Sequence, residues 1–435
     1  MAISLLTHVV SDLCLGKPAL KSLSLSSNTT IADALSAIKA SEDNFISIWC
    51  CDHQNKISTT NPRKLGGDDL NYNHNYNYNV NYDYGSSCKC VGKICMVDII
   101  CFLCKEENLE SPTSALLSPV SAILAHDSGF IKHVDPSTSL LEAIDLILEG
   151  AQNLVVPIQN TASSYCRRKQ QKVKGPTIHN GREYCWLTQE DVIQFILSRI
   201  GLFTPIPGMS VEELGIIQTN ILAVDYHAPA VSALEAISQS LVEQSSVGVV
   251  DEDGVLVGEI SPFTLSSCDE TVAAALMTLS SGDLMSYIDW GGPPEDIVSV
   301  MKEGLKEKKL EGLLELLGDE YSSLSLSLSS SYSSSSSSSS DDESVSSTTS
   351  STTSSRLTRY NRSWSYSARI VRKAEAIVCH PKSSLVAVMI QAISHRVNYV
   401  WVMEDDCTLA GIVTFRDMLE VFREYLASMV EEWGA

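Results

Sequence analysis

The sequence Gly411-Ile412-Val413-Thr414-Phe415-Arg416-Asp417 near the C-terminal end is the most informative part of this chain, because altered forms of it occur three more times upstream. These forms are Gly92-Lys93-Ile94-Cys95-Met96-Val97-Asp98, Cys185-Trp186-Leu187-Thr188-Gln189-Glu190-Asp191 and Gly258-Glu259-Ile260-Ser261-Pro262-Phe263-Thr264. A unit that recurs along a chain indicates a repeat architecture, in which neighbouring copies bury a common core. We therefore expect an array of four similar units.

Each motif follows an apolar segment with helical spacing and then a short run typical of a β-strand. In the second copy, Leu140, Ile144 and Ile147 fall on one face of a helix. The strand-like runs are rich in β-branched or aromatic residues, and they are Ile46-Ser47-Ile48-Trp49, Leu154-Val155-Val156-Pro157, Val247-Gly248-Val249-Val250 and Tyr399-Val400-Trp401-Val402. The acidic turn at 251–254 closes the third pair of strands as a hairpin. Each unit is expected to run helix, strand, turn, strand, helix.

The third and fourth copies carry a specific resemblance to a known family. Residues 249–261 and 409–417 resemble the core of a CBS domain, a family named after cystathionine β-synthase. The whole chain resembles the plant proteins that consist of four CBS repeats, a group that is distantly similar to the γ regulatory subunit of AMP-activated kinase. The resemblance implies an α+β fold of helix-strand-strand-helix units, in which four CBS repeats form two paired modules.

The expected repeat boundaries leave several segments between the folded units. The repeats are expected at 12–108, 114–203, 212–290 and 370–430. Low-complexity composition predicts disordered inserts at about 54–88 and 160–182 and a Ser-rich disordered linker at 322–369, because such segments bury too little apolar surface to offset their ordering entropy. An amphipathic helix is expected at 293–318. This helix either packs on its own module or docks a partner.

Composition limits the classes of partner and compartment. The chain has 435 residues, 44% of them hydrophobic, which is enough for two substantial cores. The formal net charge of −22 opposes binding to a phosphate backbone, so nucleic acid is not expected as a partner. The N-terminus lacks a secretory signal and no run is long enough to cross a bilayer, which predicts an intracellular soluble protein of the cytoplasm without a membrane partner.

The repeated motif can bind a nucleotide. An aspartate at the start of a helix can accept hydrogen bonds from both hydroxyls of a ribose, and a threonine three residues earlier can donate to phosphate. Nearby helix N-termini add backbone N–H groups and a favourable dipole. The pairs Thr188 with Asp191 and Thr414 with Asp417 keep both parts. The same residue types are also ordinary helix caps and strand residues, and this reading stays open.

The other two copies depart from this pattern. Copy one has Cys95 in place of the hydroxyl and keeps Asp98, whereas copy three keeps Ser261 but has Thr264 at the aspartate position. Because Thr264 stands where the family has aspartate, the ribose site of copy three is in doubt. Two further candidates for contact with phosphate precede the strand of copy four, namely His395 and Arg396. A surface position explains those two residues equally well.

The resemblance implies a ligand class and a partner class. It implies an adenine nucleotide (AMP, ADP or ATP) or S-adenosylmethionine as a regulatory ligand, with no cofactor required. The implied partners are a kinase, a thioredoxin or another metabolic enzyme, together with a second copy of the chain in a homodimer. The chain carries no Gly-rich phosphate loop, HExxH or GxSxG motif, so a non-catalytic regulatory protein is predicted. The alternative is an interaction scaffold whose degenerate sites bind no nucleotide.

The cysteines are not expected to carry chemistry. The thirteen cysteines are scattered along the predicted elements, which fits a reducing compartment. Cys101 and Cys104 have CxxC spacing but fall within a predicted helix, and Cys88, Cys90 and the pair Cys50-Cys51 form no recognisable set of four metal ligands. The sequence therefore predicts small apolar residues here and no metal site.

Overall fold

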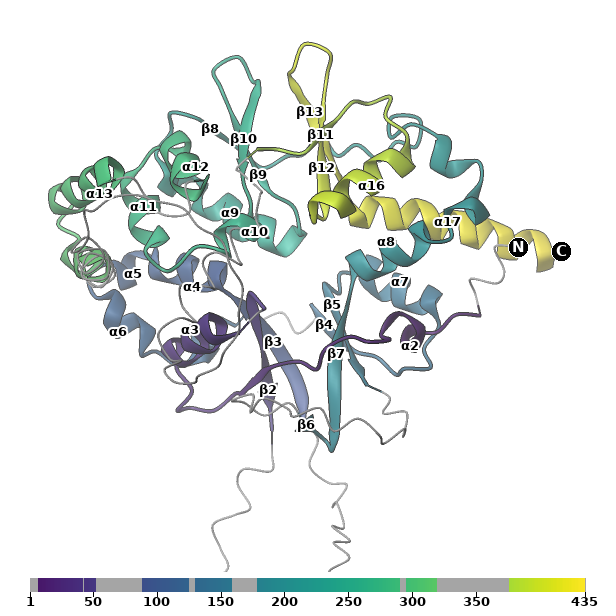
Figure 1. Ribbon diagram of the computed structural model, residues 1–435, viewed down its shortest axis with the longest axis horizontal. Coiled ribbons are helices and arrows are strands. Elements are labelled where there is room, and N and C mark those ends of the chain that lie inside the picture. The colour runs from purple at the N-terminus through teal and green to yellow at the C-terminus, as the bar shows by residue number, and fades with distance from the viewer. Residues whose placement is uncertain are drawn as a thin grey trace, which may run out of the picture. The chain divides into compact units, whose positions relative to one another are not determined.

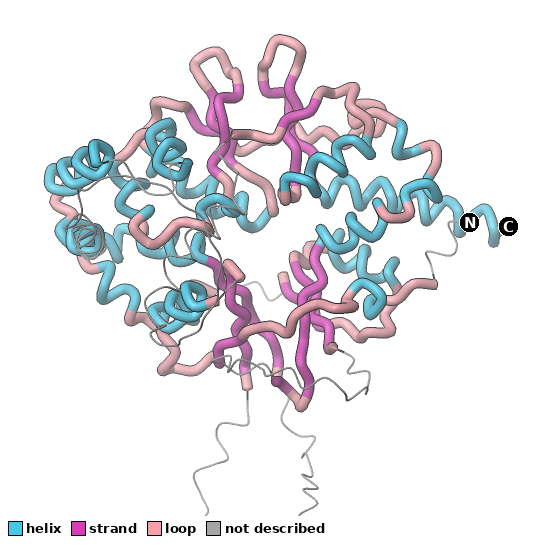
Figure 2. The backbone as a smooth tube through the Cα atoms, viewed as in Figure 1, coloured by secondary structure: helices cyan, strands magenta, loops and turns pink. Residues whose placement is uncertain are grey.

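A computed structural model of the chain describes residues 7–41, 43–51, 88–124, 130–158, 178–289, 295–318 and 375–434 (Figure 1). Short mixed sheets alternate with helices along the chain, which confirms the expected α+β class (Figure 2). Within these ranges, three sheets have three strands and one has four, in the orders β1-β2-β3, β8-β9-β10, β11-β12-β13 and β4-β5-β7-β6. Each of the four predicted copies supplies one of these sheets.

The first two copies share one order of elements. Copy one consists of β1 (Ser22–Ser24), α3 (Ile31–Ala40), β2 (Phe45–Cys50), β3 (Lys89–Cys95) and α4 (Met96–Leu103). Copy two consists of β4 (Ile131–His133), α7 (Leu140–Leu148), β5 (Asn153–Pro157), β7 (Arg182–Thr188) and α8 (Gln189–Leu197). The short helices α2 (Val10–Leu13), α5 (Glu106–Leu109) and α6 (Pro112–Leu116) lie outside this pattern.

The last two copies follow the same order. Copy three consists of β8 (Ala223–Asp225), α9 (Leu234–Glu243), β9 (Val247–Val250), β10 (Leu256–Ile260) and α10 (Pro262–Leu265). Copy four consists of β11 (Val378–Cys379), α16 (Leu385–His395), β12 (Tyr399–Met403), β13 (Leu409–Thr414) and α17 (Phe415–Gly434). Between them lie α11 (Val272–Thr278), α12 (Ser281–Asp289) and α13 (Glu295–Glu307), and a helix at 311–318 follows.

Every unit begins with a strand that the sequence pattern did not predict. The strands β1, β4, β8 and β11 pair in parallel with the first strand of the hairpin of their own copy. A parallel pair needs a crossover connection, which the intervening helix provides. These strands have only two or three residues, so they are too short for an alternating pattern to be recognised.

The chain forms two compact units. The first unit contains Met1–Cys95, Ser118–Pro207 and Phe415–Ala435, and the second contains Met96–Leu117 and Gly208–Thr414. The hairpins of copies one and two therefore lie in the first unit, and those of copies three and four lie in the second. The last helices of copies one and four do not pack with the hairpins of their own copies. Helix α4 of copy one packs on α9, α10 and α11 in the second unit, and α17 of copy four packs on α7 and α8 in the first unit.

Aromatic side chains hold the hairpins of copies one and two together. Trp49 of β2 is fully buried, and its ring lies 4.9 Å from that of Tyr184 on β7. Val155 and Trp186 from copy two belong to the same cluster, together with Cys90 of β3. Burying a large apolar side chain contributes roughly 1.5–3 kcal/mol. Residues from both copies thus share one core.

Backbone pairing joins copies three and four in the second unit. Gln218 and Ile412 exchange two backbone hydrogen bonds, each 2.9 Å long. Gly411 precedes Ile412 in the motif, and a Cβ atom there would lie 2.5 Å from the carbonyl oxygen of Gln218. In copy four, glycine at the first motif position is therefore required by a close approach of two backbones.

The amphipathic helix expected at 293–318 is two helices that pack on the second unit. α13 contacts α11, and Met301 and Leu305 are fully buried. Leu313 and Leu317 of the following helix are also fully buried. This burial supports the packing interpretation over the docking one. None of the helices in the described ranges is both long and apolar enough to cross a membrane.

Most of the expected inserts lie outside the described residues. This applies to 54–87, to 160–177 and to the Ser-rich linker at 322–369, while the repeat boundaries themselves stay predictions. The last part of the second insert is ordered differently from expectation, because β6 (Ile178–His179) pairs with β7 through the turn at Asn180 and Gly181. Both turn residues have positive φ, at 51° and 72°, which is the conformation of an Asn-Gly hairpin turn.

Candidate functional site

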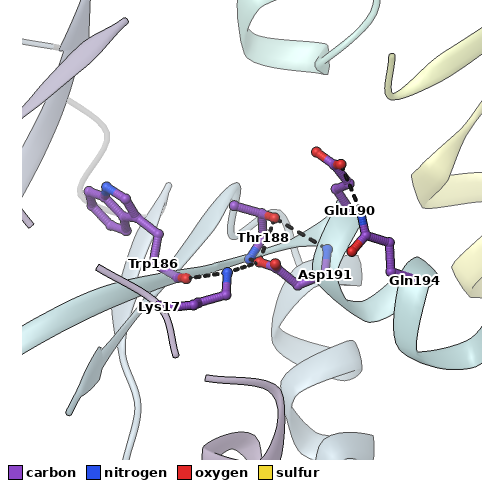
Figure 3. Close-up of polar contacts among 6 residues, drawn as sticks. All are labelled: Lys17, Trp186, Thr188, Glu190, Asp191 and Gln194. Carbon is purple, nitrogen blue, oxygen red and sulfur yellow. Dashed lines mark hydrogen bonds and ion pairs between the residues drawn. The ribbon is translucent and has the colours of Figure 1, made fainter. Parts of the chain in front are cut away.

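The motif of copy two forms a compact polar site at the start of α8. Thr188 is the N-cap residue, and both its backbone N–H and its hydroxyl donate to Oδ2 of Asp191 at 2.7 Å (Figure 3). The backbone N–H of Asp191 donates in return to the Thr188 hydroxyl at 3.3 Å. This reciprocal arrangement is a capping box. The structure thus brings the predicted Thr188 and Asp191 together.

Lys17 completes this site from far along the chain. Its ammonium forms an ion pair with Oδ2 of Asp191 and donates a hydrogen bond of 2.8 Å to the carbonyl oxygen of Trp186 (Figure 3). The side chains of Lys17 and Asp191 are each 21% exposed. A single lysine before the first strand carries no sequence signal of its own, so the sequence did not identify it. All three residues belong to the first unit.

A second capping box shows which part of this site is unusual. At the start of α3, Thr30 and Asp33 make the same three hydrogen bonds at 2.9, 2.9 and 3.2 Å, although no motif strand precedes that helix. The threonine and aspartate spacing alone therefore indicates capping. The feature that distinguishes the copy-two site from the box at Thr30 and Asp33 is the lysine that pairs with Asp191.

The polar groups of copy two retain capacity for a ligand. The hydrogen bonds and the ion pair of Asp191 within the described residues all use Oδ2, which leaves Oδ1 as an acceptor. The ammonium of Lys17 has three donors and uses two of them on Asp191 and Trp186. A partly exposed carboxylate beside an ammonium can bind a diol and an anionic group at the same time.

In the motif of copy three, the polar side chains hydrogen-bond to each other. Ser261 is the N-cap residue of α10 and accepts from the backbone N–H of Thr264 at 3.1 Å. The Thr264 hydroxyl donates to the Ser261 carbonyl oxygen at 2.9 Å. Both residues are buried, at 0% and 2% exposed. Without a carboxylate, this copy has no group that could hold both hydroxyls of a ribose.

The remaining candidates differ in their surroundings. Thr414 ends β13 and Asp417 lies in the first turn of α17, and both are buried, at 6% and 7% exposed. His395 and Arg396 are exposed at the C-terminal end of α16, where Arg396 is the C-cap residue. A helix C-terminus presents carbonyl oxygens and a negative dipole end, so its backbone does not favour phosphate. Asp98 is half-buried in the first turn of α4.

Four of the cysteines lie in two contrasting environments. Cys104 is buried with its Sγ 3.9 Å from the carbonyl oxygen of Ala273, and burial raises the pKa of both Cys101 and Cys104 to about 12. Neutral thiols of this kind are poor nucleophiles and poor metal ligands. The second environment is that of Cys51 and Cys88, whose Sγ atoms lie near a ring nitrogen of His179. The sequence did not indicate that cluster.

Comparison with known proteins identifies the family. The family model described as CBS domain matches residues 369–424. The chain is 47% identical to the CBS domain-containing protein CBSX5 of Arabidopsis thaliana, with 98% of this chain and 99% of that protein covered. It is 20% identical to the Arabidopsis SNF1-related protein kinase regulatory subunit gamma-like PV42b, over 78% of this chain and 77% of that one.

A solved structure covers most of the chain as well. Protein MJ1225 of Methanocaldococcus jannaschii aligns with 95% of this chain and 100% of its own length, with 13% sequence identity and a TM-score of 0.49. The membership itself rests on the Arabidopsis relative, because that identity of 47% extends over nearly the whole of both chains. The chain therefore belongs to the family of CBS domain-containing proteins.

Proposed function

We propose that this chain is a non-catalytic regulatory protein whose CBS modules bind an adenosine-containing ligand and modulate a partner protein. The ligand is an adenine nucleotide or S-adenosylmethionine. A ligand that bridges two repeats stabilises the module geometry that it fits, and the bound partner responds to that geometry.

The observation that carries this proposal is the ion pair between Lys17 and Asp191 at the start of α8. A helix cap needs only Thr188 and Asp191, as the simpler box at Thr30 and Asp33 demonstrates. The added ammonium supplies a positive charge where a phosphate would meet the helix N-terminus. The acceptor Oδ1 of Asp191 is then available to the ribose.

The partner class rests on the relatives. One relative is named as a gamma-like regulatory subunit of an SNF1-related protein kinase, which supports a kinase as the partner. Binding of recombinant catalytic subunit of such a kinase, and its activity with and without AMP, would test this part. Light scattering of the purified chain would test the homodimer.

Calorimetric titration of the full chain with AMP, ADP, ATP and S-adenosylmethionine tests the ligand. We expect saturable binding of at least one of them, weakened about tenfold or more by Asp191→Asn and by Lys17→Met, which corresponds to about 1.4 kcal/mol. Asp417→Asn examines copy four in the same way. The matched control is Asp33→Asn, because it changes the same capping geometry outside the motif and should leave the affinity unchanged.

A second candidate is an interaction scaffold without a ligand. The observation that favours it is the motif of copy three, where the hydroxyls of Ser261 and Thr264 are engaged within one helical turn. Absence of binding for all four compounds, with the protein shown to be folded, would establish the scaffold and contradict the sensor. Affinity lost equally in Asp33→Asn and Asp191→Asn would indicate a stability effect instead of a site.

A further inference from the structure

Three side chains with metal-binding atoms converge in the first unit, away from the motif sites. Cys51 directly follows β2, Cys88 directly precedes β3, and His179 ends β6. One ligand atom from each side chain lies within 4.8 Å of the other two. Since β2 and β3 belong to copy one and β6 belongs to copy two, the cluster joins two repeats.

The distances suit tetrahedral coordination. The register of the hairpin pairs Cys50 with Lys89, which places Cys51 opposite Cys88. The Sγ of Cys51 lies 3.4 Å from Nδ1 of His179. With Zn–S bonds of about 2.3 Å and Zn–N bonds of about 2.0 Å at tetrahedral angles, sulfur and nitrogen ligands lie about 3.5 Å apart. Only small shifts are needed for both atoms to reach one ion.

The histidine is oriented as metal ligands usually are. Its other nitrogen, Nε2, lies 2.8 Å from the hydroxyl of Ser22, which can accept a hydrogen bond from Nε2–H. This tautomer directs the lone pair of Nδ1 toward the cysteines. The imidazole stacks on Trp49 with a centroid distance of 3.8 Å and an interplanar angle of 3°. Hydrogen bonding and stacking together fix the ring.

Burial and charge fit a divalent ion. Cys88 and His179 are buried, at 4% and 3% exposed, whereas Cys51 is half-buried. Two thiolates neutralise the charge of a divalent cation, so the complex is neutral and burying it is less costly than burying an isolated ion. The backbone of Cys88 is held by Asn180, whose amide group makes two hydrogen bonds to it, at 2.8 and 2.9 Å.

We propose that Sγ of Cys51, Sγ of Cys88 and Nδ1 of His179 bind one Zn²⁺ ion, with water as the fourth ligand. Binding forms two Zn–S bonds and one Zn–N bond, and the two thiol protons pass to solvent. The ion connects the two ends of the segment 52–87 with the hairpin of copy two. By linking two repeats, it stabilises the first unit.

A disulfide between Cys51 and Cys88 is the competing interpretation. It would explain the proximity of the two sulfur atoms, but it assigns no role to His179 or to the Ser22 contact. The histidine and its partner therefore favour a metal ion. The two interpretations predict different spectra and different metal contents.

Cobalt titration of the reduced, metal-free full chain tests the site. We expect one Co²⁺ per chain, with a thiolate-to-cobalt charge-transfer band and d–d absorption that zinc abolishes. Cys51→Ser and Cys88→Ser should lose the band, and His179→Gln should weaken cobalt binding about tenfold or more. Ser22→Ala should weaken it by about tenfold through the second coordination shell. The matched controls are the exposed cysteines, Cys50→Ser and Cys407→Ser, which should bind like the wild type.

Two further measurements show whether each variant that loses cobalt binding is still folded. Circular dichroism and the thermal unfolding midpoint of each metal-free variant distinguish loss of the site from loss of the fold. If Cys88→Ser does not fold, Cys51→Ser is the variant that tests the cysteine ligands. The proposal is overturned if the folded wild type shows no charge-transfer band or if the band persists in both cysteine variants. Peptide mapping that finds Cys51 joined to Cys88 in protein that binds no cobalt after reduction would assign the cluster to redox chemistry instead.

Discussion

The indole N–H of Trp401 donates a hydrogen bond of 2.7 Å to Oε2 of Glu259, whose side chain is fully buried. The other carboxylate oxygen accepts from the hydroxyl of Tyr399 at 2.9 Å. Glu259 comes from the motif of copy three, and both donors come from the first hairpin strand of copy four. One carboxylate thus joins two repeats, because buried donors and acceptors must be paired.

Replacing this carboxylate should destabilise the second unit. Glu259→Leu leaves the donors of Tyr399 and Trp401 buried without their acceptor, so we expect a loss of about 2–5 kcal/mol in the free energy of unfolding, measured in urea. Glu259→Gln should cost less, because an amide oxygen can still accept one bond. The exposed turn residue supplies the control, and Glu252→Gln should stay within about 0.5 kcal/mol. Wild-type stability of Glu259→Leu would contradict the pairing.

The first motif position should tolerate alanine in copy one but not in copy four. A Cβ at Gly411 would lie 2.5 Å from the backbone oxygen of Gln218, whereas a Cβ at Gly92 would meet the flexible tip of Leu124. Gly411→Ala should therefore cost about 1–3 kcal/mol or more, because backbone must move. Gly92→Ala should cost less than Gly411→Ala. Thermal unfolding of both variants measures the difference, and equal losses would refute the backbone argument.

Acid should weaken the first unit through His133. Its Nε2 accepts from the backbone N–H of Cys90 at 3.0 Å, and burial lowers the pKa of the imidazole below its ordinary value of 6.5. The unfolded chain therefore binds a proton at higher pH than the folded one. The contribution to stability is complete above pH 6.5 and decreases as the pH falls from there toward the folded-state pKa.

Unfolding midpoints of chelator-treated protein between neutral and mildly acid pH would measure this dependence. His133→Gln keeps an acceptor for Cys90 but does not titrate, so its midpoint should vary less with pH than that of the wild type. Identical pH profiles for the two proteins would exclude His133 as the source.

The docking of α17 on α7 should depend weakly on salt. Arg423 makes two hydrogen bonds to the carboxylate of Asp145, at 2.5 and 3.1 Å, and this contact raises the pKa of the guanidinium. Both side chains are partly exposed, at 28% and 40%. A double-mutant cycle of Arg423→Met and Asp145→Asn should give a coupling of about 0.5–1 kcal/mol that decreases at high salt. A salt-independent coupling, or none, would contradict an ion pair.

The hairpins could be predicted because their signals are local. The runs 247–250 and 399–402 coincide with β9 and the first four residues of β12, since β-branched and aromatic residues bounded by turns favour short strands. The predicted helical face of Leu140, Ile144 and Ile147 is buried on α7. The strand β6 was missed, although its Asn-Gly turn at Asn180 and Gly181 is a recognisable signal.

The candidate site could be predicted only in part. Thr188 and Asp191 were identified because they lie in one motif, and the same motif identified Ser261 and Thr264. Lys17 could not be found, because it lies 169 positions from Trp186, to which it donates a hydrogen bond. No periodicity or spacing relates residues so far apart.

By itself, the sequence determined four hairpin units and the residue types at each motif, because strand propensity, helical spacing and turn chemistry act over a few neighbouring residues. The identity of the units that share a core, and of the helices that α4 and α17 pack against, became known from the folded structure. The folded structure also showed that Lys17 pairs with Asp191 and that Cys51, Cys88 and His179 meet. These contacts depend on how distant segments pack, and burial of apolar surface, which drives that packing, is not directional.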